Sequence, residues 1–81
     1  MENYRRLKMK ETITDKIVEC KSLLKEAEQS FLIDNNKVGN LYLKMCYNTM
    51  KEIYNLEGET ERFYTLAYRY NKIEMDYVKR G

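Results

Sequence analysis

Side chains that could act as catalysts or metal ligands are few in this chain of 81 residues, and their spacing matches no catalytic motif. Histidine, the commonest general base and transition-metal ligand, is absent. Cys20 and Cys46 are far apart and form no CxxC pair, so they do not supply a zinc site. Ser22 and Ser30 lie beside charged neighbours, not in the glycine-rich turn that exposes a serine nucleophile. We therefore expect a protein that is not an enzyme and that carries no metal or other cofactor.

The composition also argues against several kinds of ligand. Gly39 and Gly58 each stand alone, so the chain has no glycine-rich loop to hold a phosphate group. A net charge of +2 indicates neither nucleic acid nor an anionic membrane as the obvious partner. The acidic residues are scattered at positions that a solvated helix face explains.

The expected location of the protein in the cell follows from the lack of long apolar segments in its sequence. No apolar run approaches the roughly 20 residues that span a bilayer, and the basic N-terminal residues lack the apolar stretch of a signal peptide. We therefore expect a cytoplasmic protein without a membrane span. There, Cys20 and Cys46 are expected to be reduced and buried, although their even number leaves a disulfide open.

Tyrosine is the unusual residue of this chain, with eight copies. All except Tyr4 lie in its second half. Tyrosines at a surface are frequent in binding interfaces, because they bury a large area at little cost in rotamer entropy. Three fall on the expected core stripes described below and four fall beside them: Tyr42, Tyr70 and Tyr77 in the first group, Tyr47, Tyr54, Tyr64 and Tyr68 in the second. The second group either borders the core or lines a groove that receives a partner helix or an extended peptide.

A basic stretch near the N-terminus is the second candidate binding feature. It contains Arg5, Arg6, Lys8 and Lys10 against a single acidic residue, Glu2. Two interpretations are open. The stretch is a solvated chain end, or it is an arm that contacts the phosphates of nucleic acid or lipid.

The elements that position these residues are expected to be helices, because proline is absent and glycine occurs only three times. Apolar residues of the first segment recur at steps of three and four, which places them on one stripe of a helix. They are Ile13, Ile17, Cys20, Leu24, Ala27 and Phe31. Thr12 and Asp15 resemble a capping box, and Asp34 to Asn36 supply turn residues after the helix.

Two further segments have the same periodicity. The stripe of the second comprises Tyr42, Met45, Thr49, Ile53 and Leu56, widened by Leu43, Cys46 and Met50. A stripe of this width predicts contact with two neighbours. The stripe of the third comprises Phe63, Leu66, Tyr70, Ile73 and Tyr77. Gly58 is expected to end the second helix and Thr60 to cap the third.

These patterns predict an all-α, up-down-up antiparallel three-helix bundle over residues 12–81, with helices at about 12–33, 37–57 and 60–80. The three helices are expected to have similar lengths, and their short connections make neighbours antiparallel. Residues 1–11 form the basic arm, into which the first helix can extend.

The segment from Ala27 to Lys44 resembles the first helical hairpin of MIT domains, the three-helix bundles of endosomal-sorting ATPases and some deubiquitinases. The shared features are the late alanine of the first helix, the polar turn at residues 34–36, and the pair Leu41-Tyr42 before Lys44. The third segment is similar in spacing, so the resemblance covers roughly residues 13–80. It implies that a partner's short helical or extended tail binds in a groove between helices. The third-helix residues nearest such grooves would be Leu66, Tyr70, Ile73 and Tyr77.

Three hypotheses for function follow. The first is a module that binds another protein in an inter-helix groove. The second is a small nucleic-acid-binding regulator that uses the basic arm, with Arg69, Lys72, Lys79 and Arg80 as an extension. The third is a structural homo-oligomer that buries the tyrosine surface against another copy of itself.

Overall fold

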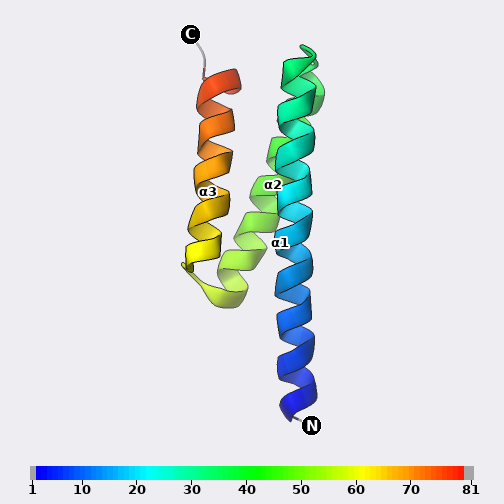
Figure 1. Ribbon diagram of the computed structural model, residues 1–81, viewed down its shortest axis with the longest axis vertical. Coiled ribbons are helices and arrows are strands. Elements are labelled where there is room, and N and C mark those ends of the chain that lie inside the picture. Colours follow the sequence, from blue (N-terminus) through cyan, green and yellow to red (C-terminus); the bar gives the residue numbers. More distant parts are fainter. Residues whose placement is uncertain (1, 80–81) are drawn as a thin grey trace.

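The computed structural model describes the backbone of residues 2–79 and the side chains of residues 12–79. Three α-helices make up most of this part of the chain: α1 (Glu2–Leu32), α2 (Asn36–Glu57) and α3 (Glu61–Ile73). A π-helical turn, η1 (Glu74–Val78), continues α3. The helices run up, down and up, and residues 2–79 contain no β-strand (Figure 1). The predicted all-α, antiparallel three-helix bundle is confirmed. Within the same residues, no helix is both long and apolar enough to cross a membrane.

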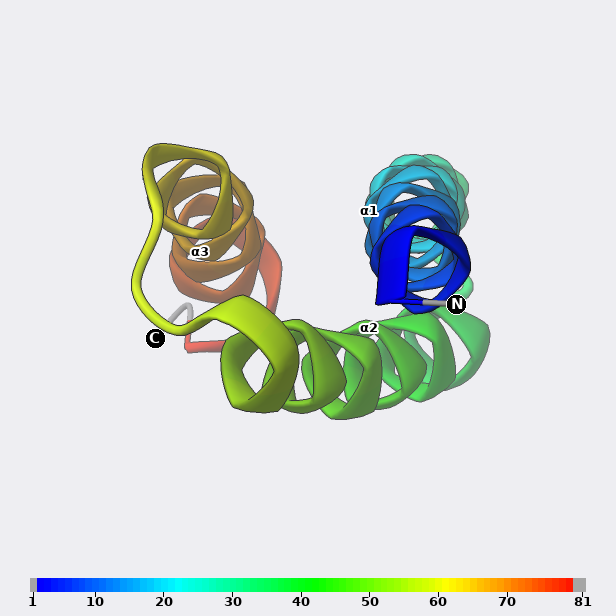
Figure 2. The ribbon, with the colours of Figure 1, turned by 90° about the horizontal axis from the view of Figure 1, so that it is seen from below.

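Helix α2 is the centre of the bundle, because both other helices pack on it. Seen from below, α1 and α3 lie on the same side of α2 (Figure 2). The contact of α1 with α2 is the most extensive, that of α2 with α3 is smaller, and α1 touches α3 least. The molecule is therefore an α1–α2 hairpin with α3 packed mainly on α2.

The buried face of α1 is the predicted one. All six residues of its predicted stripe are buried, and Leu23 is buried beside them. The buried face of α2 differs from the expected one, since Met45 is 44% exposed and Leu56 is 38% exposed. Thr49 and Ile53 of the predicted stripe are buried, together with the three residues that were expected only to widen it: Leu43, Cys46 and Met50. Because α2 contacts two helices, its buried face is centred between them.

The expectation of three helices of similar length is wrong. Helix α1 has 31 residues, α2 has 22 and α3 has 13. The capping box at Thr12 does not start a helix, because α1 runs through it and begins at Glu2. Nothing in the preceding sequence breaks a helix, so the first turns of α1 extend beyond the other helices (Figure 1). Helix α3 ends early because η1 follows, in which the Lys79 N–H donates to the Glu74 carbonyl at 2.9 Å.

The two connections use the turn residues that the sequence predicts. After α1, Asp34 takes the left-handed conformation with φ 61°, and its N–H donates to the Phe31 carbonyl at 3.0 Å. The Asn35 N–H donates to the Ser30 carbonyl at 2.8 Å, which completes a Schellman turn. The Asn35 side chain then caps α2 by accepting from the Val38 N–H. After α2, Gly58 has φ 74° as expected of a helix-ending glycine.

Gly39 lets α1 and α2 approach each other closely near this turn. A Cβ atom at Gly39 would lie 2.8 Å from the ring of Phe31. That ring has little room to move, because Phe31 is 3% exposed and stacks on Tyr77 with ring centroids 5.2 Å apart. The glycine therefore serves helix packing at a position inside a helix, where alanine has the better propensity.

Gly39→Ala is expected to lower the free energy of unfolding by about 1–2 kcal/mol, because overpacking against Phe31 outweighs the gain in helix propensity. Urea unfolding followed by circular dichroism measures the change. Asn40→Ala is the control, since Asn40 is exposed in the same turn and alanine there should leave stability unchanged or raise it. If Gly39→Ala stabilised the chain as much as Asn40→Ala, the ring of Phe31 would not constrain the hairpin.

Candidate binding groove between α2 and α3

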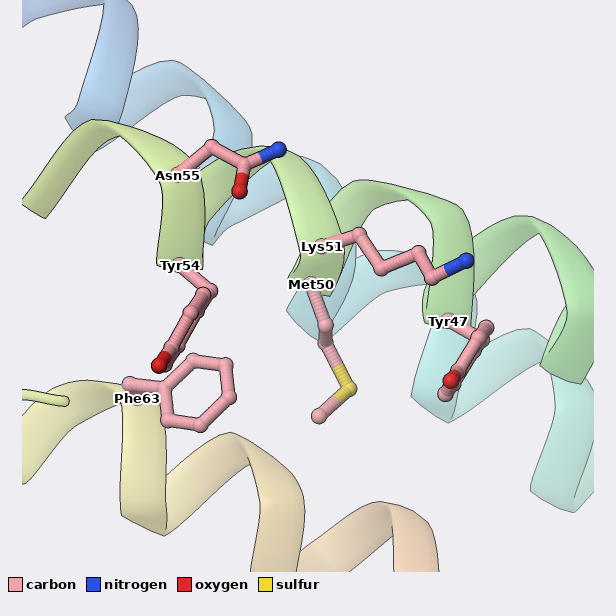
Figure 3. Close-up of a pocket in the computed structure, with 6 residues that line it drawn as sticks. All are labelled: Tyr47, Met50, Lys51, Tyr54, Asn55 and Phe63. Atoms are coloured by element: carbon pink, nitrogen blue, oxygen red, sulfur yellow. The ribbon is translucent and has the colours of Figure 1, made fainter. Parts of the chain in front are cut away.

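A groove of about 410 Å³ lies between α2 and the first turn of α3. We call it the aromatic groove, after the three rings among its lining residues Tyr47, Met50, Lys51, Tyr54, Asn55 and Phe63 (Figure 3). Five of these residues belong to α2, and Phe63 comes from α3. Its volume lies within the range of about 300–1,000 Å³ that is usual for ligand sites in proteins.

The α2 wall of the groove follows from helical spacing. Tyr47, Met50 and Tyr54 are three and four residues apart, so their side chains project from one side of α2, towards α3 (Figure 3). Met50 is buried in the floor, whereas Tyr47 is 46% exposed and Tyr54 is 47% exposed. The groove therefore presents two half-exposed aromatic rings above an apolar floor.

One positive charge lies at the rim. The Nζ atom of Lys51 is 5.1 Å from the centroid of the Tyr47 ring, within the range of a cation–π interaction. Lys51 is exposed, so its ammonium group remains accessible to an anion. The rim can thus pair with an acidic group next to an apolar side chain in the groove.

The α3 wall depends on the short connection after α2. Phe63 lies with its ring centroid 5.6 Å from that of Tyr54, and their planes are tilted by 53°. The backbone N–H of Phe63 donates to the hydroxyl of Thr60, which caps α3 as predicted. That hydroxyl in turn donates to a carboxylate oxygen of Glu57 at 3.1 Å, and the Nε of Arg62 donates to the same oxygen at 2.7 Å. Glu57 therefore ties the end of α2 to the start of α3 and fixes where Phe63 meets Tyr54.

The charge of Glu57 is stabilised by this arrangement. The hydrogen bond from Arg62 lowers the pKa of the Glu57 carboxyl below its usual value, and the bond from Thr60 adds to this effect. Without these donors, a carboxylate at the C-terminal end of α2 would face the negative end of the helix dipole. The ion pair of Glu57 with Arg62 offsets that repulsion.

Glu57→Gln is expected to lower the melting temperature at neutral pH by a few degrees, because it removes the charge that accepts from Arg62. The pKa of Glu57 is lower in the folded than in the unfolded chain, so its contribution is present at neutral pH. It is lost as the pH falls through the folded-state pKa. The difference between wild type and variant should therefore shrink in acid. Thermal melts at neutral pH and near pH 3 test this, with Glu28→Gln, an exposed site on α1, as control. A difference independent of pH would contradict the charged role.

The other tyrosines of the second group lie outside the lining. The Tyr64 ring meets Phe63 edge-on at 6.0 Å, and its hydroxyl donates to Glu59 at 2.8 Å. This hydrogen bond raises the pKa of Tyr64. Tyr64 therefore packs against Phe63, one of the residues that line the groove. Tyr68 is 70% exposed and is not among the residues that line the groove.

The resemblance to MIT domains implies four third-helix residues near a groove, of which two are buried in the core and two are half-buried. Leu66 is 0% exposed and Ile73 is 4% exposed, so both are core residues that solvent does not reach. Tyr70 and Tyr77 are half-buried. The ring of Tyr70 lies 6.0 Å from that of Tyr47, and burial, with Glu74 nearby, raises the pKa of Tyr70 to about 12.

A second hollow of about 380 Å³ lies at the opposite end of the bundle, where Tyr77 stacks on Phe31. Its other lining residues are Leu32, Asp34 and Asn36, at the turn between α1 and α2. Tyr77 therefore does not share a site with Tyr47 and Tyr54. The structure therefore separates Tyr77 from the tyrosines of the aromatic groove.

The basic residues Arg5, Arg6, Lys8 and Lys10 have their backbone within α1, and their side chains lie outside the part of the chain that the structure describes. Their interpretation as an arm for phosphates stays a prediction. Among residues 12–79, no group of cysteine and acidic side chains is placed to hold a metal ion.

Sequence reasoning did not single out Lys51 and Asn55, and it placed Phe63 and Met50 only in the core. The sequence signal for Lys51 was its spacing from Tyr47 and Tyr54, because residues three and four apart lie on the same side of a helix. What the sequence does not reveal is which turn of α3 lies opposite them. That depends on the three-residue connection between α2 and α3.

No protein family, curated protein or solved structure matches this chain.

Proposed function

We propose that this protein is a non-catalytic protein–protein interaction module whose aromatic groove binds a short helical or extended segment of a partner protein. The observation that carries the proposal is the pair of half-exposed rings, Tyr47 and Tyr54, which line one groove in which Phe63 packs against Tyr54. Aromatic side chains at such sites bury much apolar area on binding, while their two side-chain torsions limit the entropy lost.

The groove is already organised without a ligand. Phe63 holds the Tyr54 ring on one side, and Lys51 and Tyr70 contact the Tyr47 ring on the other. A site whose side chains are held in place loses little entropy when it binds. This supports binding of a segment that inserts one or two apolar side chains between the rings.

The kind of occupant is proposed from two features. An acidic group beside the inserted apolar residue would pair with Lys51 at the rim. The resemblance of the hairpin to MIT domains proposes the same class of ligand, a partner's helical or extended tail. In this chain, however, Leu66 and Ile73 are core residues, so the aromatic groove takes the place of a third-helix site that includes them.

A displayed library of short peptides is expected to yield ligands that combine an apolar or aromatic residue with an adjacent acidic residue. Tyr54→Ala should weaken their binding at least about tenfold, because hot-spot residues, among which tyrosine is enriched, cost about 2 kcal/mol or more when truncated to alanine. Tyr68→Ala is the matched control, the same truncation at a site outside the groove. Isothermal titration calorimetry measures both, and circular dichroism checks that each variant is folded.

Two results would count against this function. Selected peptides that bind Tyr54→Ala as well as wild type would place the binding site elsewhere. A solution mass that rises with concentration in wild type but not in Tyr54→Ala would instead show that a second copy of the chain occupies the groove.

A further inference from the structure

Cys20 and Cys46 form a close pair in the centre of the hairpin, and nothing in the proposed function uses them. Cys20 comes from α1 and Cys46 from α2, and both are free thiols with 0% exposure. Their Sγ atoms are 3.0 Å apart. From this geometry we propose that the two residues are a redox modification site, at which a reversible disulfide joins α1 to α2.

The contact is nearly symmetric, as two facing positions of antiparallel helices require. The Sγ of Cys20 lies 4.0 Å from the Cys46 carbonyl oxygen, and the Sγ of Cys46 lies 3.8 Å from the Cys20 carbonyl oxygen. Each side chain therefore reaches the backbone of the other helix. A disulfide needs its sulfurs at about 2.05 Å, so closing the bond requires them to approach by about 1 Å. Side-chain torsions and a small helix shift can supply such a movement.

The two thiols share one chemical environment. Either Sγ atom can donate to the other across their 3.0 Å contact. The positive charge of Arg69 lowers the pKa of both thiols, which favours the thiolate that begins an exchange, whereas burial opposes its formation. Either cysteine can therefore attack first, and the other then resolves the intermediate.

The oxidant is a small-molecule disulfide such as oxidised glutathione. The thiolate of one cysteine attacks one sulfur of that disulfide, a mixed disulfide forms, and the first small thiolate leaves and takes up a proton. The other cysteine then loses its proton and attacks the sulfur of the bonded cysteine, and the second small thiolate leaves and takes up that proton. Two cysteine thiols are oxidised by two electrons, and one disulfide is reduced to two thiols.

Burial of the two thiols slows the formation of the disulfide, whereas the length of the loop that it closes determines how much it stabilises the fold. Because neither thiol is exposed, the exchange requires a transient opening of α1 from α2, and the reaction is slow. The closed product encloses residues 20–46, including the whole turn between the helices. A cross-link over a loop of this length restricts the unfolded chain and stabilises the folded one.

The test is equilibration of the 81-residue chain in reduced and oxidised glutathione, under native conditions and in concentrated urea. Acid quenching and mass spectrometry give the fraction of intramolecular disulfide, and peptide mapping identifies the bonded cysteines. We expect the effective concentration of the two thiols, measured against glutathione, to be at least about a hundredfold higher in the folded chain than in urea. The reason is that a disulfide which stabilises the fold is itself stabilised by the fold to the same extent. The oxidised chain should melt at least about 10 °C higher, and a reductant should reverse the shift.

An effective concentration in the folded chain equal to or below that in urea would overturn the proposal. So would products limited to mixed disulfides with glutathione or to dimers of two chains. Cys46→Ser is the matched variant, which should accumulate only the mixed disulfide of Cys20 and show no reversible rise in melting temperature. The wild-type comparison does not depend on that variant being folded. Peptide binding to the aromatic groove is measured separately, so failure of either proposal leaves the other testable.

Discussion

Helices α1 and α2 pack closely because small residues lie where they meet. Gly39 leaves room for the ring of Phe31, and Cys20 and Cys46 bring their sulfur atoms within 3.0 Å of each other at the middle of the hairpin. Ala27 of α1 is likewise completely buried. A larger side chain at any of these positions would push the helix axes apart and loosen the contacts along their whole length. The bundle depends on this close packing, because α3 has its main contact with α2, whose orientation the hairpin fixes.

The position of α3 follows from a second, smaller constraint. Only three residues join α2 to α3, and Glu57, Thr60 and Arg62 form a hydrogen-bonded link across them. The link places Phe63 opposite Tyr54, so the same residues that cap α3 also form the groove. A capping interaction contributes about 1 kcal/mol to stability. Beyond this contribution to stability, the link determines the shape of the surface between α2 and α3.

The sequence predicts those features that depend on periodicity and on turn chemistry. The helices, their order, the buried stripe of α1 and the end of α2 at Gly58 are all confirmed. The unequal helix lengths were not predicted, because Thr12 and Asp15 resemble a capping box, whereas α1 continues through them and begins at Glu2. The turn η1 was not predicted either, since its residues also fit an ordinary α-helix. Of the candidate site, Tyr47 and Tyr54 were named in advance. Lys51 and Phe63 were not assigned to it, because a groove between two helices depends on their relative placement.

The two sides of α2 have different chemical roles, and the difference is a consequence of residue size. Towards α1 it presents glycine, cysteine and aliphatic residues, which allow a close, fully buried contact. Towards α3 it presents Tyr47 and Tyr54, whose rings pack on Tyr70 and Phe63 and still remain half-exposed. The short helix α3 does not cover these large rings completely. The hairpin thus supplies the rigidity, and the incomplete cover of α2 by α3 leaves the aromatic surface on which the proposed binding function rests.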